Sequence, residues 1–240
     1  MLAVLEELNP AAVWANATVP LAVVSRSGSI ESVHRGSIAV ATGDGQLIAH
    51  AGDPELPVYW RSTAKLHQAI PLVMNGGLDR WQLTQRQLAI ICGSHNGEPE
   101  QVRIVASILD RIGLRASDLH CGVQEPHGSE AAHELIRRCE APGPLHNTCS
   151  GNHAGLLALS RLLGTSSSNY EAKTHEVQRR ALEIVARFAG ISVDKIGVGV
   201  DGCGIPSYRT PLAAGRHLGT RTSMREARYL RTSQCSAPAR

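Results

Sequence analysis

Two residues that can carry out acyl-transfer chemistry lie three positions apart near the start of the chain. Lys65 is one of only three lysines among 240 residues, and it ends the sequence Arg61-Ser62-Thr63-Ala64-Lys65. In a helix, residues i and i+3 share a face, so the Lys65 amine would reach the Ser62 hydroxyl. A neutral lysine is one of the few bases that can take a proton from serine. The pair predicts covalent hydrolysis of an acyl group, although Ser-x-x-Lys also arises by chance.

A polar, glycine-rich break at residues 92–98 follows an apolar helical pattern and exposes side chains and backbone donors together. Ser94 is a candidate second hydroxyl of the same site. His95 is a candidate acid, base or ligand, because imidazole titrates near neutral pH. The alternative is a turn that only separates two helices.

Thiol and imidazole groups gather in two further clusters. Cys149 and His153 lie four residues apart where a helix is expected to begin, and Asp201 and Cys203 lie at a glycine-rich strand end. Helix N-terminal amides favour an anionic group or a thiolate. Two cysteines, a third protein ligand and a water would make an open zinc site. The spacing is not that of a zinc finger, and isolated cysteines are as often small buried hydrophobic residues.

The apolar pattern predicts an α+β domain in which helices cover an antiparallel sheet. Short strands joined by glycine-containing turns form an antiparallel meander near the N-terminus, and a block of helices separates them from a later strand. The expected strands are 21–25, 29–34, 38–42, 46–51 and 195–200, and the expected helices are 62–74, 84–92, 99–112, 129–139, 152–163 and 174–189. Thr84 is the expected cap of the second helix, and Gly113 and Gly190 are the expected ends of two others.

Composition indicates an ordinary globular protein. An apolar fraction of 42% is enough for a sizeable core. Neither a signal peptide nor a membrane span is apparent, so we expect a cytoplasmic enzyme. Six irregularly spaced cysteines without an export signal favour free thiols or metal ligands over disulfides.

Charge is distributed unevenly along the chain. Residues 207–240 hold seven arginines and one acidic residue, whereas the whole chain carries a net charge of only +3. Apolar periodicity also ends near Ser207. We therefore expect a basic, disordered tail from residue 207; binding to nucleic acid or an acidic surface is the alternative.

Four motifs in this order resemble the Rhizobium-type L-asparaginase II family. They are Arg-Ser-x-x-Lys, Cys-x-Ser-His-x-Gly-Glu, Asn-x-Cys-Ser-Gly-x-His-Ala-Gly and Asp-Gly-Cys-Gly-x-Pro, and the resemblance spans about Pro20 to Pro206. It implies a fold like that of serine β-lactamases and glutaminases, and hydrolysis of L-asparagine to L-aspartate and ammonia with little use for glutamine. It also implies that Ser62 is the nucleophile, Lys65 its base and Ser94 the second serine of the paired dyads.

The resemblance also implies binding residues. Arg61, Asp201 and His153 match positions that line the family's site, and His95 is a further substrate-binding candidate. Cys149 and Cys203 match two zinc ligands. Asn152 stands where the family has a lysine as third ligand. An amide oxygen is a weaker ligand beside two thiolates, so we expect zinc to bind weakly.

The sequence departs from the family after Pro206, because no lysine follows Lys195. We therefore expect an incomplete catalytic domain at residues 1–206, truncated at its C-terminal side, with low or absent activity. A second interpretation is another serine acyl hydrolase of the β-lactamase or glutaminase type, although no Lys-Thr-Gly motif is present. A third is a non-enzymatic, basic-tailed binding protein. The first implies L-asparagine as partner, neither nucleic acid nor membrane, and leaves a homodimer open.

Overall fold

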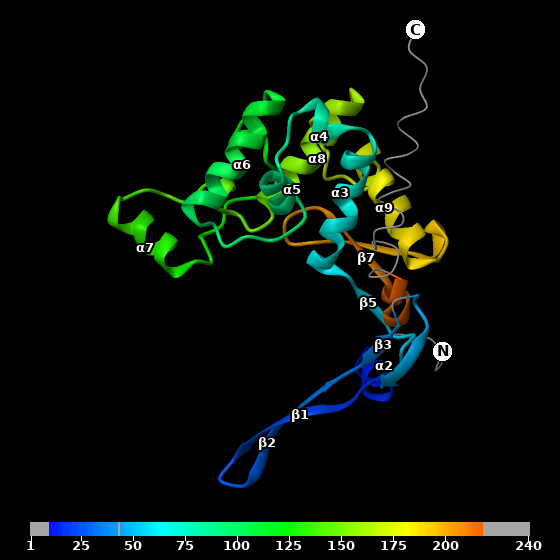
Figure 1. The fold of residues 1–240 in the computed structure, drawn as a ribbon. Helices are drawn as coiled ribbons and strands as arrows, with labels where there is room; N and C mark the ends of the chain where they lie inside the picture. The colour runs from blue at the N-terminus through cyan, green and yellow to red at the C-terminus, as the bar shows by residue number, and fades with distance from the viewer. Residues whose placement is uncertain (1–9, 43, 218–240) are drawn as a thin grey trace, which may run out of the picture. The chain divides into compact units, whose positions relative to one another are not determined.

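The computed structural model of the protein describes residues 10–42 and 44–217 (Figure 1). These residues divide into two compact units. The first contains the described residues through Val58, the short segment Phe188–Ile191 and the described residues from Thr210 onward. The second contains Tyr59–Arg187 and Ser192–Arg209. All residues expected to form the site belong to the second unit.

The first unit is built mainly from two β-hairpins. β1 pairs with β2 in an antiparallel ladder that places Val23 opposite Val33, and β3 pairs with β4 in a second two-stranded sheet. The elements of this unit are α2 (Pro10–Ala17), β1 (Val19–Arg26), β2 (Ser29–Gly36), β3 (Ile38–Ala41), β4 (Leu47–Ala51) and the 3-10 helix η5 (Leu212–His217).

The second unit is mostly helical. In chain order the elements that lie wholly or mostly in it are the 3-10 helix η1 (Arg61–Ala64), α3 (Lys65–Met74), α4 (Gly77–Arg80), α5 (Gln85–Ile91), α6 (Pro99–Ile112), η2 (Ala116–Asp118), α7 (Ser129–Arg137), η3 (Pro144–His146), α8 (Ser150–Leu163), α9 (Glu176–Ala189), η4 (Val193–Lys195), β6 (Gly197–Val200) and β7 (Pro206–Pro211). The short strand β5 (Pro57–Tyr59) contributes only Tyr59 to it. Strands β6 and β7 pair antiparallel, with Gly197 opposite Arg209 and Val200 opposite Pro206.

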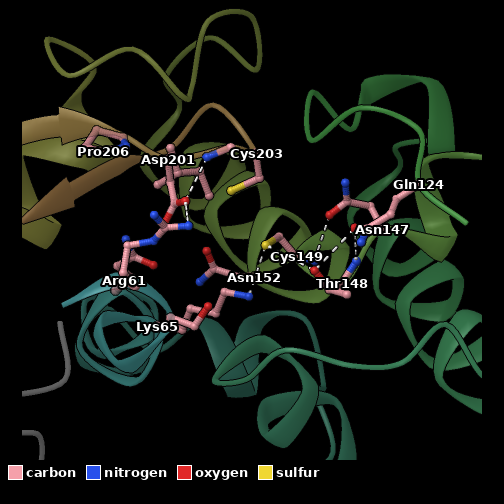
Figure 2. A pocket seen from close by; sticks show the side chains of 14 residues that line it. Arg61, Lys65, Gln124, Asn147, Thr148, Cys149, Asn152, Asp201, Cys203 and Pro206 are labelled. Carbon is pink, nitrogen blue, oxygen red and sulfur yellow. Dashed lines mark hydrogen bonds and ion pairs between the residues drawn. The ribbon is translucent and has the colours of Figure 1, made fainter. Parts of the chain in front are cut away.

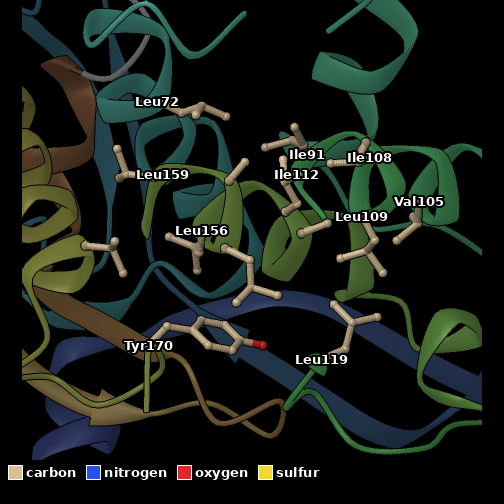
Figure 3. Close-up of a cluster of buried hydrophobic side chains, with 14 of the residues drawn as sticks. Leu72, Ile91, Val105, Ile108, Leu109, Ile112, Leu119, Leu156, Leu159 and Tyr170 are labelled. Atoms are coloured by element: carbon tan, nitrogen blue, oxygen red, sulfur yellow. The ribbon is translucent and has the colours of Figure 1, made fainter. Parts of the chain in front are cut away.

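Helix α8 is the centre of the second unit's core. Every residue from Ser150 to Ser160 is buried, and α8 packs against α3, α5 and α6 (Figure 1). A helix that is buried on all sides favours apolar or small residues all round, and the buried part of α8 has them except at Asn152 and His153. Figure 3 shows the side chains that fill this core, including Leu72, Ile91, Ile108, Leu109, Leu156 and Leu159.

Two glycines let α8 approach α5 closely. A Cβ atom on Gly151 would lie 2.4 Å from the carbonyl oxygen of Ile90, and one on Gly155 would lie 2.3 Å from Cγ2 of Ile91. Both distances are far below van der Waals contact, so a side chain at either position would force the helices apart. The packing of these glycines therefore fixes the first turn of α8 against the end of α5.

The predicted α+β class is confirmed, and so are several helix ends. Thr84 caps α5 in a capping box with Gln87, and Gly113 ends α6 in a left-handed conformation, with φ of +70°. The predicted meander is wrong, because its four strands form two separate hairpins. The predicted cover of helices over a sheet is also not how the core forms: helices pack mainly on helix α8.

The expected boundary after Pro206 falls at the first residue of β7. Residues 207–217, assigned to a disordered tail by their composition, instead form β7 and η5, and Ser207, Tyr208 and Thr210 are buried. The remainder of the predicted tail, residues 218–240, lies outside the described residues. Among the helices that are described, none is long and apolar enough to cross a membrane.

Candidate active site

A cavity of about 340 Å³ in the second unit collects most of the predicted site residues (Figure 2). We call it the first cavity. Its wall comes from η1 and the start of α3, the first turn of α8, the loop between β6 and β7, and the segment that contains Gln124. The predicted residues that line it are Arg61, Ser62, Lys65, Cys149, Asn152, Asp201 and Cys203.

Lys65 lies at the wall of this cavity and is only 4% exposed. Its Nζ lies 2.8 Å from Ser94 Oγ and 3.2 Å from Cys149 Sγ. No hydrogen bond joins Lys65 to Ser62 in the described part of the chain. Ser62 lies in the 3-10 helix η1 and α3 begins at Lys65. Residues i and i+3 also share a face in a 3-10 helix, so the helix type does not explain the missing side-chain bond; Lys65 Nζ is instead engaged by Ser94 and Cys149. Lys65 therefore pairs across the chain with Ser94 rather than along its own helix.

Arg61 and Asp201 form an ion pair at the cavity, with 2.9 Å between guanidinium Nη2 and carboxylate Oδ1. Arg61 has a φ of +50°, a left-handed conformation that is uncommon outside glycine. Such backbone strain persists where the surroundings determine it, and it often occurs at functional sites. The pair places one positive and one negative group at the cavity wall beside Ser62.

The two predicted zinc-binding thiols lie beside each other at this wall (Figure 2). Cys149 is the N-cap residue of α8 and bonds through its amide to the Asn147 side-chain oxygen at 2.8 Å. A hydrogen bond from Cys203 lowers the pKa of Cys149, and the Lys65 ammonium lowers it further. The neighbouring Cys149 sulfur raises the pKa of Cys203. Cys149 is therefore the thiolate of the pair, and Cys203 donates to it.

Asn152 follows one turn after Cys149 and is 1% exposed. Asn152 is among the residues that line the cavity; its Nδ2 donates to the Ile91 carbonyl at 3.4 Å, while its buried Oδ1 has no hydrogen-bond partner among the described residues. No group of three histidine, cysteine or acidic side chains with metal-binding geometry occurs among the described residues. The two thiols and the free amide oxygen are nevertheless a donor set that fits a weak zinc site.

The sequence of this chain matches a known protein family over most of its length. The family model for L-asparaginase II matches residues 22–235. The chain belongs to the L-asparaginase II family. A comparison with curated proteins finds no match. Family membership supports a hydrolase that acts on an amide substrate. The match also extends beyond Pro206, where the motif-based resemblance was expected to end.

The two histidines predicted to bind substrate lie outside the lining of the first cavity. His95 is buried, receives a hydrogen bond from the Gly97 amide at Nδ1, and bonds through Nε2 to Ser150 Oγ at 2.8 Å. Burial lowers the pKa of His95 to about 4, so the ring is neutral. His95 therefore ties the loop that carries Ser94 to the first residue of α8.

His153 has a comparable position deeper in α8. It is fully buried, and its Nδ1 lies 2.6 Å from the Tyr170 hydroxyl. That hydroxyl also accepts a hydrogen bond from the His120 backbone N–H at 2.8 Å. Burial lowers the pKa of His153 to about 3. Its Nε2 has no hydrogen-bond partner in the described structure. Through the Tyr170 hydroxyl, His153 therefore links α8 to Tyr170 and to the segment that contains His120.

Four further residues of the first cavity carry polar side chains that we did not predict: Gln68, Gln124, Asn147 and Thr148. Asn147 donates to the Cys121 carbonyl at 2.8 Å, and Gln124 Oε1 accepts the Thr148 amide at 3.2 Å. Asn147 lies inside the third L-asparaginase II motif, so its identity was available from the sequence. Gln124 lies outside all four motifs and enters the wall only through folding.

Proposed function

We propose that the protein hydrolyses the side-chain amide of L-asparagine to L-aspartate and ammonia on a fold like that of the serine β-lactamases. The observation that carries this proposal is the contact of 2.8 Å between Lys65 Nζ and Ser94 Oγ at a cavity that also holds Ser62 and the Arg61–Asp201 pair. An amine within hydrogen-bond reach of a hydroxyl is the geometry that proton transfer needs.

The Arg61–Asp201 pair supports an amino-acid substrate. L-Asparagine carries an α-carboxylate and an α-ammonium, which complement a guanidinium and a carboxylate respectively. Binding would exchange one ion pair between Arg61 and Asp201 for two with the substrate. This exchange orients the side-chain amide, because both ends of the amino-acid backbone are held. The β-lactam nucleus has no α-ammonium, so the pair favours an amino-acid amide over a β-lactam as substrate; L-glutamine carries the same two charges, and only the assay separates it from L-asparagine.

The chemistry that we propose proceeds through an acyl-enzyme. Ser62 Oγ attacks the amide carbon, and its proton passes to Lys65 Nζ. This step requires the neutral amine and an approach of Nζ to Ser62 when substrate binds, since in the free protein Nζ donates to Ser94 and Cys149. The tetrahedral intermediate collapses as the amide nitrogen takes a proton from Lys65 and leaves as ammonia. A water molecule then attacks the ester carbon, and L-aspartate is released with Ser62 restored. Ser62 is the proposed nucleophile because it lines the cavity, whereas Ser94 contacts only the base.

Zinc fits this proposal only as a weakly held group. Cys149 and Cys203 would hold it with Asn152 Oδ1, the buried oxygen without a hydrogen-bond partner. When bound, the ion would add positive charge beside the substrate. Lys65 Nζ lies 3.2 Å from Cys149 Sγ, so a zinc ion would share this thiolate with the positive charge of Lys65.

Ammonia release from L-asparagine by purified, monodisperse protein tests the proposal, with L-glutamine as comparison substrate. Ser62→Ala and Lys65→Met should each lower kcat on the order of a thousandfold, because nucleophile and base act as a unit. Ser117→Ala is the matched control, since Ser117 is exposed and lies outside the cavity wall. Folded wild-type protein that releases no ammonia from L-asparagine would contradict the proposal.

Acid quenching followed by peptide mass spectrometry identifies the serine that becomes acylated. We expect the acyl group on Ser62 and its absence in Ser62→Ala. An acyl group on Ser94, with activity retained in Ser62→Ala, would assign the attack to Ser94 and leave Lys65 as base.

A further inference from the structure

Two free thiols from distant segments of the second unit meet at the wall of the first cavity. Cys149 precedes the first turn of α8, and Cys203 lies in the turn between β6 and β7. Both are half-buried, and Figure 2 shows them beside each other at the cavity. Cys203 donates a hydrogen bond to Cys149. The fold therefore places a thiol pair where a small oxidant in solution can reach it.

Cys149 is the thiol at which oxidation should begin. Its sulfur lies 3.2 Å from Lys65 Nζ and 3.7 Å from Thr148 Oγ1, and the residue is the N-cap of a helix of fourteen residues. A cationic neighbour and a helix N-terminus both favour the thiolate, which is the form that attacks a peroxide. Cys203 then faces the oxidised sulfur as the second thiol.

The turn that carries Cys203 has room to bring its sulfur closer. A disulfide needs a sulfur–sulfur distance of about 2 Å, which is shorter than a hydrogen-bonded contact. Gly202 and Gly204 flank Cys203, and a Cβ atom on Gly202 would meet nothing within 4 Å, so the backbone can adjust there. Cys121 is a poorer partner, because it is buried, donates to the Pro144 carbonyl at 3.5 Å and lies outside the cavity lining.

We propose that hydrogen peroxide joins Cys149 and Cys203 in a reversible disulfide at the first cavity. The Cys149 thiolate attacks one peroxide oxygen, so an S–O bond forms, the O–O bond breaks and hydroxide leaves. The Cys203 sulfur then attacks the sulfenic acid at sulfur, an S–S bond forms, and the hydroxyl group leaves as water with the thiol proton. The two sulfurs together lose two electrons, which reduce the peroxide.

The disulfide changes the cavity wall in two ways. It withdraws both thiols from zinc, which Asn152 supports only with an amide oxygen. It also ties the start of α8 to the turn of residues 201–205, which is closed by hydrogen bonds between Asp201 and both Gly204 and Ile205. Asp201 therefore moves with Cys203, and its ion pair with Arg61 is displaced. The resulting loss of hydrolysis rests on the proposed function, whereas the disulfide itself does not.

Peptide mapping of the full chain identifies the bond. Metal is removed with a chelator, hydrogen peroxide is added in small excess, free thiols are blocked with N-ethylmaleimide, and the protein is digested without reduction. Trypsin releases residues 139–161 with Cys149 and residues 196–209 with Cys203. We expect these two peptides to be joined, and dithiothreitol to separate them. Cys139 shares the first peptide, so Cys139→Ser, a change at an exposed position outside the cavity lining, is the matched control and should keep the crosslink.

Cys203→Ser tests the order of events. Without the second thiol, Cys149 should keep a sulfenic acid that dimedone labels, and no crosslink should form. In the wild-type protein, zinc added before peroxide should slow the crosslinking, and the crosslinked protein should bind zinc at least about tenfold more weakly than the reduced protein. Ammonia release should fall at least about tenfold on crosslinking and return with dithiothreitol.

Unjoined peptides, with both thiols still blocked by N-ethylmaleimide after peroxide, would overturn the proposal. A bond from Cys149 to Cys121 would overturn it as well. Crosslinked protein that releases ammonia as fast as reduced protein would refute the displacement of the Arg61–Asp201 pair. Reduced protein that releases no ammonia would instead contradict the proposed hydrolysis, and the peptide map would still decide whether the disulfide forms.

Discussion

Helix α8 and the β1–β2 hairpin have similar apolar side chains in opposite surroundings. The first eleven residues of α8 are all buried, whereas every residue of β1 after Val19 is exposed. All the predicted site residues lie in the unit that α8 organises, and none lies in the hairpin. The difference indicates that packing around α8 sets the geometry of the first cavity. Changes near α8 should therefore affect stability and activity together, and changes in the hairpin should affect neither.

The largest effect on folding is expected from Leu157→Ala at the centre of α8. Leu157 is completely buried in the helical core. Removing its side chain leaves a cavity, and we expect a loss of about 2–5 kcal/mol in the free energy of unfolding. Urea denaturation followed by circular dichroism measures it. A loss below about 1 kcal/mol would show that the core around α8 is not tightly packed.

A smaller effect is expected where α8 meets α5. Gly151→Ala places a Cβ atom against the Ile90 carbonyl oxygen, and backbone cannot move aside as a side chain can. We expect a loss of about 1–3 kcal/mol from overpacking. Gly143→Ala is the matched control, because a Cβ there meets nothing within 4 Å and the φ of −125° suits alanine. Equal stability of the two variants would contradict the close approach of α8 to α5.

Local signals in the sequence predicted much of the fold near these helices. The capping pair of Thr84 and Gln87 and the glycine after Ile112 each act within one helical turn, so the sequence alone reveals them. Strand β7 gave no such signal, because Tyr208 and Thr210 are buried by residues distant in the chain. Composition suggested a disordered tail there, since burial by tertiary contacts does not show in local periodicity.

The site was predictable in its members but not in its contacts. Arg61, Asp201 and the two cysteines meet at the first cavity as their motifs indicated. Lys65 pairs with Ser94, which lies twenty-nine residues away, and helical spacing within one segment cannot reveal a contact that forms only on folding. His95 and His153 were predicted from their residue type and motif position, which do not reveal that both rings are engaged in buried hydrogen bonds.

The start of α8 should also give Cys149 unusual reactivity. Its pKa is lowered, so the thiolate persists at pH values where an ordinary thiol is protonated. We therefore expect Cys149 to be alkylated by iodoacetamide at pH 6.5 at least about tenfold faster than Cys139, an exposed cysteine for comparison. The measurement is peptide mass spectrometry after timed quenching, with a chelator present. Equal rates for both thiols would contradict the lowered pKa.

The same end of α8 should hold zinc only in part. Two thiols and one amide oxygen make a weaker site than three strong ligands. Elemental analysis after gentle desalting should give less than one zinc per chain. Stoichiometric zinc would show that Asn152 is an adequate third ligand. Zinc that persists in a Cys149→Ser, Cys203→Ser double variant would place the metal elsewhere.

The smallest effect is expected in the β1–β2 hairpin. Val23 and Val33 are cross-strand partners that remain 54% and 48% exposed. Because the two side chains bury little surface, Val33→Ala should change the free energy of unfolding by no more than about 0.5 kcal/mol and leave ammonia release unchanged. Thermal melts at several protein concentrations check this expectation. A loss above about 2 kcal/mol, with a melting temperature that rises with concentration, would show that association buries this surface. In that case the β1–β2 hairpin would be exposed only in the isolated chain. In the associated protein it would be part of a packed interface, and it would no longer differ from α8 in burial.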